Sequence, residues 1–303
     1  MGEIKMKKLK WMTTATAMSA ALLLAACGDD TADSNDTSSS SSSNDLGSIE
    51  LAYVEWDSEV ASTYVVAEVL ESVGYDVEIT PLDNAIMWEA VSKSEADAMV
   101  AGWLPGTHAA QYEKYGADLE DLGPNLQGAK IGLVVPAYMD VASIDDLSAE
   151  AASTITGIES GAGIMAATER ALEEYPNLAS WNLLPSSSGA MTVALEQAIK
   201  NEEEIVVTGW TPHWKFASHD LKYLEDPKGI YGGDENIHTF VRQNLEQDAP
   251  EAYKVLDAFE WTTADIEEVM LDVYSGTKPE DAAKKWIDKN EDRVNTWTEG
   301  VKK

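Results

Sequence analysis

The stretch GWLPGTH at residues 102–108 has one counterpart in the chain, GWTPHW at residues 209–214. Each copy ends a short run of apolar and β-branched residues, ADAMVAGW in the first case and EIVVTGW in the second. Runs of this kind predict buried β-strands. The repeat therefore predicts two similar halves, in each of which a strand ends at a Gly-Trp-x-Pro turn.

Strand patterns and helix patterns alternate along the chain, and the same order occurs twice. In the first half, strands are expected at 48–56, 75–82 and 96–103, with helices at 58–72 and 84–93. In the second half, strands are expected at 153–160, 181–187 and 204–210, with helices at 164–175 and 189–200. This alternation predicts an α/β fold with parallel strands, whose loops at the carboxyl ends of the strands form binding crevices.

The loops after the strands also correspond between the two halves. Trp56 precedes Trp103 by the same number of residues as Gly163 precedes Trp210. Each half thus offers one loop after its first strand, EWDSE or GAGIM, and one Gly-Trp-x-Pro turn after its third. Two α/β lobes that face each other would bring all four loops into one shared cleft.

Three tryptophans stand on these loops, namely Trp56, Trp103 and Trp210. Converging indoles attract a quaternary ammonium by cation–π interaction, at about 0.5 to 2 kcal/mol per ring. An ordinary amine would leave N–H groups unpaired against the rings. Structural packing is the alternative for each tryptophan alone, but their equivalent positions favour a cage for a quaternary ammonium.

A second group of candidate residues suits an anion. In SGAGIM the glycines come directly before a helix, so the amides of Gly163 and Ile164 are free to hold a negative charge. His108, which closes GWLPGTH, can donate to the same anion, and a helix cap or a surface position is its alternative role. A cage for a cation beside a site for an anion predicts a betaine as ligand.

The N-terminal residues predict export and a membrane anchor. Residues 1–26 combine a lysine-rich start with a short apolar run, as in a signal peptide. The run ends at LAAC and resembles a bacterial lipobox, which would make Cys27 the lipidated first residue of the mature chain. An ordinary secretory signal is the alternative. Residues 28–47 are polar, with six consecutive serines, and predict a disordered tether.

Composition argues against several classes of function. The 54 acidic and 21 basic residues give a formal charge of −33, which would repel nucleic acid and anionic lipid. The histidines lack metal-ligand spacing and the single cysteine is Cys27, so we expect no metal and no cofactor. A surface-anchored hydrolase is a competing hypothesis, but neither GxSxG nor SxxK supports it, and we expect no enzyme activity.

Five separated motifs together resemble the glycine betaine substrate-binding proteins of osmoprotective ABC importers. They are LAYVEWDSEVAST, AGWLPGTH, GLVVP, SGAGIM and TGWTPHW, and the likeness covers nearly all of residues 48–303. The resemblance implies a two-lobed, type II periplasmic-binding-protein-like α/β fold with the ligand in the interlobe cleft. It implies a monomeric receptor on the extracytoplasmic face of the membrane, which closes around its ligand and delivers it to a permease. A receptor for choline, carnitine or another quaternary amine is the alternative.

The same resemblance assigns roles to residues. By motif, the tryptophan box falls on Trp56, Trp103 and Trp210, and the carboxylate contacts fall on Gly163, Ile164 and His108. The expected lobes are 48–128 plus 237–303 for lobe 1, and 129–236 for lobe 2, after a signal peptide at 1–26 and a tether at 27–47. The half with EWDSE comes first, whereas some relatives have the opposite order.

The other tryptophans are expected to be structural. Trp88 and Trp181 lie within helix or strand patterns and are expected in the core, and Trp214 is expected to pack behind the cage. The remaining three belong to a helical C-terminal tail that we expect to pack on the first lobe; they are Trp261, Trp286 and Trp297.

Overall fold

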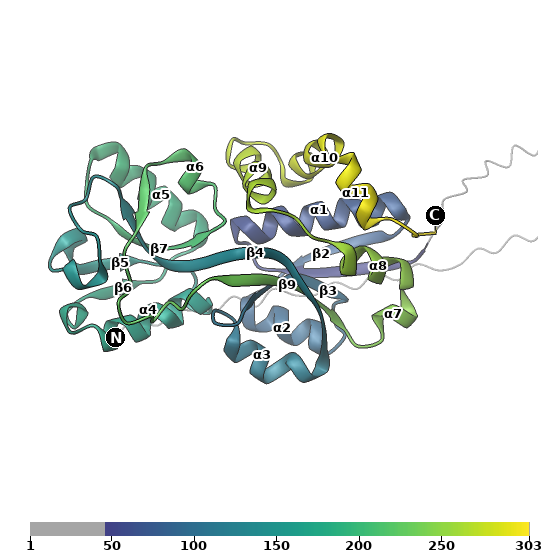
Figure 1. Cartoon of the computed structure of the whole chain (residues 1–303), viewed down its shortest axis with the longest axis horizontal. Coiled ribbons are helices and arrows are strands. Elements are labelled where there is room, and N and C mark those ends of the chain that lie inside the picture. Colours follow the sequence, from purple (N-terminus) through teal and green to yellow (C-terminus); the bar gives the residue numbers. More distant parts are fainter. Residues whose placement is uncertain (1–45, 303) are drawn as a thin grey trace, which may run out of the picture. The chain divides into compact units, whose positions relative to one another are not determined.

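The computed structural model describes residues 46–302, which form one compact unit (Figure 1). The expected signal peptide, Cys27 and nearly all of the expected tether lie outside the described residues. Leu46 and Gly47 already belong to the folded part, since Leu46 N donates to Gly74 O and Asp76 N donates to Gly47 O. None of the helices between residues 46 and 302 has the length and apolar character that a membrane span requires.

The first half contains a parallel three-stranded group. Strand β1 (Ser48–Tyr53) pairs in parallel with β2 (Asp76–Pro81) and with β3 (Ala98–Leu104). The connections are helices α1 (Asp57–Val73) and α2 (Asn84–Ser92). The predicted strands and helices of this half are confirmed to within a few residues. Helix α3 (Ala109–Tyr115) follows β3 directly after the first Gly-Trp-x-Pro turn.

The second half repeats this arrangement. Strand β5 (Thr154–Thr156) pairs in parallel with β6 (Asn182–Leu184) and β7 (Val206–Thr211), and helices α4 (Gly163–Glu174) and α5 (Ser188–Asn201) connect them. Here too the sequence placed the elements correctly, although β5 and β6 are shorter than expected. The α/β fold class and its duplication are therefore confirmed.

Two antiparallel strands that the sequence did not predict join the halves. Strand β4 (Leu119–Pro136) pairs with β9 (Glu235–Arg242) along its first part and with β7 from Lys130 to Val134. The resulting order is β2-β1-β3-β9-β4-β7-β5-β6, and β8 (Leu221–Tyr223) pairs with β4. Strands β4 and β9 run from one half to the other (Figure 1). The strands that the sequence predicted do pair in parallel, but β4 and β9 were missed, because glycine and proline interrupt the β4 pattern, which shows register shifts against β9.

The C-terminal helices cover the first half. Helices α9 (Thr263–Tyr274) and α10 (Pro279–Lys289) contact α1, and α8 (Pro250–Ala258) contacts both α1 and α11 (Glu291–Trp297). Trp261, Trp286 and Trp297 are buried there, as expected, and so are Trp88 and Trp181 in the core. Short elements complete the described part: α6 (Lys215–Ser218), α7 (Leu245–Asp248), and 3₁₀ turns at Gly116–Asp118, Ile144–Asp146, Glu150–Ser153 and Pro176–Leu178.

The glycine of each Gly-Trp-x-Pro motif lies against one of the two joining strands. A Cβ on Gly102 would lie 2.2 Å from Cε2 of Phe240 in β9, and a Cβ on Gly209 would lie 2.4 Å from Cγ2 of Val134 in β4. The peptide bonds Leu104–Pro105 and Thr211–Pro212, which follow the two tryptophans, are both cis. Glycine at the first position of each motif therefore allows a joining strand to pack closely against the end of the third parallel strand.

We predict that Gly102→Ala destabilises the fold. The added methyl would overlap the buried Phe240 ring, and overpacking of this kind costs roughly 1 to 3 kcal/mol. The free energy of unfolding from urea denaturation measures the loss. Gly233→Ala is the matched control, because nothing lies within 4 Å of a Cβ at that exposed position. Equal stability of the two variants would contradict the packing argument.

Candidate ligand-binding site

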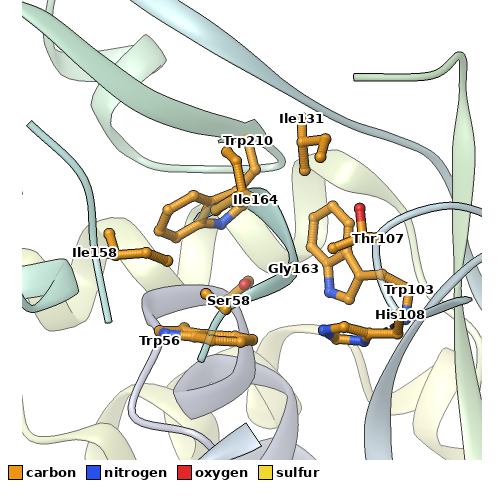
Figure 2. Close-up of a pocket in the computed structure, with 11 residues that line it drawn as sticks. Trp56, Ser58, Trp103, Thr107, His108, Ile131, Ile158, Gly163, Ile164 and Trp210 are labelled. Atoms are coloured by element: carbon orange, nitrogen blue, oxygen red, sulfur yellow. Dashed lines mark hydrogen bonds between the residues drawn. The ribbon is translucent and has the colours of Figure 1, made fainter. Parts of the chain in front are cut away.

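A small pocket lies between the two halves and takes its walls from both of them (Figure 2). All six predicted site residues line it. The complete lining is Trp56, Ser58, Trp103, Thr107, His108, Ile131, Ile158, Ala162, Gly163, Ile164 and Trp210.

Parallel strands explain why residues so far apart in the sequence meet here. Trp56 directly precedes α1 after β1, Trp103 lies near the end of β3, and Trp210 lies near the end of β7. The carboxyl ends of parallel strands meet at one edge of a sheet, and ligands bind outside that edge. The three indoles surround the cavity from different sides (Figure 2), and each is at most 7% exposed.

The ring of Trp56 is held from both halves of the chain. Its Nε1 donates to Oε2 of Glu159, at 2.9 Å, and Glu159 follows β5 in the second half. The imidazole of His108 lies beside the indole, with ring centroids 6.2 Å apart and planes 23° apart (Figure 2). Because the polar edge of Trp56 is hydrogen-bonded, the ring can present its apolar face without leaving a donor unpaired.

His108 is a neutral hydrogen-bond donor. Its Nδ1 accepts from the amide of Trp103 at 3.0 Å, which leaves the proton on Nε2. Burial lowers the pKa of His108 to about 3, and a backbone contact with Ala101 opposes this only in part. Nε2 is buried and has no hydrogen-bond partner among the described residues. An unpaired buried donor in a cavity wall is suited to an acceptor on a ligand.

Gly163 and Ile164 supply two further donors. They are the first two residues of α4, so their amides have no acceptor within the helix. The helix dipole favours negative charge at this end. A Cβ on Gly163 would lie only 2.1 Å from the carbonyl oxygen of Thr107, which belongs to the other half. Only glycine allows the two backbones to approach this closely.

The comparison with protein families agrees with this geometry. Residues 47–289 match the OpuAC family, the substrate-binding domain of ABC-type glycine betaine transport systems. This chain belongs to the OpuAC family. The match includes every described helix except α11, which begins at Glu291.

Individual relatives agree as well. The chain is 55% identical to a lactococcal OpuAC solved in a closed-liganded conformation with glycine betaine, with a TM-score of 0.82 over 84% of this chain and 100% of that one. It resembles a choline-binding protein of an ABC transporter, solved with choline, at 26% identity and a TM-score of 0.78 over 85% of this chain and 93% of that one.

A curated relative is the glycine betaine/carnitine transport binding protein GbuC of Listeria monocytogenes. It is 55% identical over 159 residues, which are 52% of this chain and 53% of GbuC. The chain thus matches about half the length of that relative.

Sequence reasoning missed part of the wall of this OpuAC-family site. Ser58 lies in EWDSE and Thr107 lies in GWLPGTH, but neither residue was predicted to line the site. Ile131 lies on the unpredicted strand β4. Glu235 was also missed, because it begins β9, the second strand that the sequence did not predict. Its Oε1 accepts from the amides of Gly106 and Thr107 at 2.6 and 2.7 Å, and so it fixes the turn that carries His108.

A lysine lies beneath the cage. Lys215 is fully buried, its Nζ is 4.3 Å from the ring centroid of Trp210, and this atom has no hydrogen-bond partner among the described residues. Burial lowers the pKa of Lys215 to about 7, against a smaller attraction from Asp57. Lys215 does not line the cavity, so this amine lies behind the ring and not on the ligand side. Between residues 46 and 302 there is no group of three or more His, Cys, Asp or Glu side chains that could hold a metal ion.

We predict that Lys215→Met changes how stability depends on pH. The pKa of Lys215 is about 7 in the folded chain and about 10.4 in the unfolded chain, so the wild type loses stability as the pH falls from about 10.4 to about 7. The variant has no amine at this position and lacks this loss. Its free energy of unfolding should therefore rise by about 1 kcal/mol or more relative to that of the wild type as the pH falls over that range. Urea denaturation at several pH values measures it. Lys200→Met, at an exposed position, should follow the wild type; if Lys215→Met does so too, the buried amine is not destabilising.

Proposed function

We propose that this chain is an extracytoplasmic receptor that captures glycine betaine and delivers it to an ABC importer for osmoprotection. The observation that carries the proposal is the composition of the cavity wall. Three indoles surround one small space, and three unpaired donors reach it from His108, Gly163 and Ile164. The OpuAC family, to which the chain belongs, supports the same substrate class.

The trimethylammonium group of the ligand is assigned to Trp56, Trp103 and Trp210. This group has no N–H to donate, and its charge is spread over methyl groups that pack against indole faces. At about 0.5 to 2 kcal/mol per ring, three rings contribute roughly 2 to 6 kcal/mol before the entropy of binding is counted. A primary or secondary amine lacks this match, because no carboxylate lines the cavity to accept its protons.

The carboxylate of the ligand is assigned to Nε2–H of His108 and to the amides of Gly163 and Ile164. All three donors are neutral, so they stabilise the anion through hydrogen bonds and through the dipole of α4. Because the donors that hold the carboxylate carry no positive charge, they do not repel the trimethylammonium group at the other end of the ligand. The site therefore suits a zwitterion better than a simple anion.

Delivery is proposed to work through closure of the cleft. The cavity takes walls from both halves, so a bound ligand bridges them and shifts the population toward a closed state that a permease can recognise. Lipidation of Cys27 would hold this receptor, as a monomer, near the outer face of the membrane, with residues 28–45 as its tether.

Choline is the main alternative ligand, because a solved choline-binding protein shares the fold. Choline keeps the quaternary ammonium but has no carboxylate. It would leave Nε2–H of His108 and the two α4 amides unpaired, which costs affinity. Carnitine carries both groups at a greater separation. Titration of residues 43–303 with glycine betaine, carnitine and choline by calorimetry discriminates among them; equal affinity for glycine betaine and choline would remove the assigned role of the anion site.

We predict that Trp103→Ala and Trp210→Ala each weaken glycine betaine binding by about 2 kcal/mol, or roughly 30-fold in Kd. Phenylalanine at either position should lose less, since a ring remains. His108→Ala should also lose less than the tryptophan variants, because two amide donors remain. Calorimetry gives the Kd values, and circular dichroism verifies folding. Wild-type affinity in both alanine variants would refute the cage.

A further inference from the structure

Trp214 joins the two halves at a place outside the cavity. It was expected to pack behind the cage, and its ring does contact His213, which lies next to Trp210; it also contacts the first half. Its Nε1 donates to Oδ1 of Asp57 at 2.7 Å, and its ring stacks on Tyr274 with centroids 3.7 Å apart and planes 12° apart. Asp57 begins α1 and Tyr274 ends α9, whereas Trp214 follows β7. Trp214 is 2% exposed and does not line the cavity.

The carboxylate of Asp57 is surrounded by groups from the second half. Besides Trp214, Oγ of Ser188 donates to its Oδ2 at 2.8 Å, and Nε2 of His213 lies 3.6 Å from the same oxygen. Burial acts to raise the pKa of Asp57, but the contacts with His213, Trp214 and Ser188 outweigh it and hold the pKa well below its usual range. The carboxylate is therefore ionised and makes charge-assisted hydrogen bonds across the halves.

The segment that carries Trp214 also carries the cage residue Trp210. The rings of Trp210 and His213 have centroids 4.7 Å apart, and those of His213 and Trp214 have centroids 5.3 Å apart. His213 is fully buried between them. The three rings form one packed series from the cavity wall to the junction with α1 and α9. A ligand that fixes Trp210 therefore fixes the position from which Trp214 reaches Asp57.

We propose that Asp57, Trp214 and Tyr274 form a latch that stabilises the closed arrangement of the two halves and slows ligand release. The proposal rests on the proposed function, because only a receptor that opens and closes needs such a device. Separation of the halves breaks two hydrogen bonds to Asp57 and the Trp214–Tyr274 stack together. Asp57 and Trp214 are positioning residues, since neither lines the cavity.

The latch acts on dissociation more than on association. Its contacts form only once the halves have come together, after the ligand has met the open cleft. Loss of a hydrogen bond to a charged group corresponds to roughly a 10- to 100-fold change in an equilibrium constant. We assign most of this change to the rate of ligand release, as is usual when contacts form late in binding.

Two variants test the latch in residues 43–303. Asp57→Asn removes the charge with little change in shape, and Trp214→Phe keeps an aromatic ring but removes Nε1–H. Asp83→Asn is the matched control. Asp83 directly precedes α2 in the first half, much as Asp57 begins α1, but it is exposed and its side chain makes no cap hydrogen bond. Stopped-flow fluorescence with glycine betaine gives the association and dissociation rates, and urea denaturation verifies that each variant is folded.

In the expected result, both latch variants release glycine betaine about tenfold faster or more, while their association rates stay within about twofold of the wild type. The control matches the wild type in both rates. Dissociation rates like that of the control in both latch variants would overturn the proposal. A purely structural role would lower stability without this separation of the two rates.

A measurement without ligand separates failure of the latch from failure of the proposed function. Spin labels on Leu184→Cys and Asp288→Cys, exposed positions in different halves, report the distance between them. If the wild type does not bind glycine betaine, the proposed function fails, and the distances measured without ligand then test the latch by themselves. A short-distance population that Asp57→Asn depletes supports the latch; an equal population in both proteins, or none in the wild type, overturns it.

Discussion

The close packing of two antiparallel strands against the motif glycines is the constraint on which the site depends. Phe240 of β9 and Val134 of β4 occupy the space that a side chain on Gly102 or Gly209 would need. This contact fixes the end of β3 and the end of β7, and with them the backbone positions of Trp103 and Trp210. The same two strands join the halves, so the packing that closes each core also aims the two tryptophan-bearing turns at one cavity (Figure 2).

The electrostatics of the cavity are those of a site without formal charge. A chain with a formal charge of −33 could attract cations nonspecifically, but the cavity itself is lined by indoles, aliphatic side chains and neutral donors. Burial keeps His108 neutral, and Glu159 and Glu235 are engaged in orienting Trp56 and the 104–108 turn. Recognition of a small zwitterion then depends on π faces and backbone dipoles, which hold both ends of the molecule without placing a like charge beside either of them.

The latch and the cage form one mechanical unit because they stand on one short segment. Trp210 faces the cavity, His213 is buried next to it, and Trp214 reaches α1 and α9 of the other half. Asp57 stands between two residues of the cavity wall, Trp56 and Ser58, yet points to the second half. Ligand contact and closure are therefore coupled through adjacent residues on both sides of the cleft, with no need for a long pathway.

The sequence by itself determined the repeated α/β halves, the loops at the strand ends, and the six residues that meet in the cavity. These follow from local periodicity and from motif spacing, which a single chain displays directly. Only the tertiary structure decided the strands β4 and β9, because glycine and proline obscure their pattern, and with them the roles of Ile131 and Glu235. It also decided the partner of Trp214, since a hydrogen bond between residues as distant as Asp57 and Trp214 depends on how the two halves pack, which no local pattern encodes.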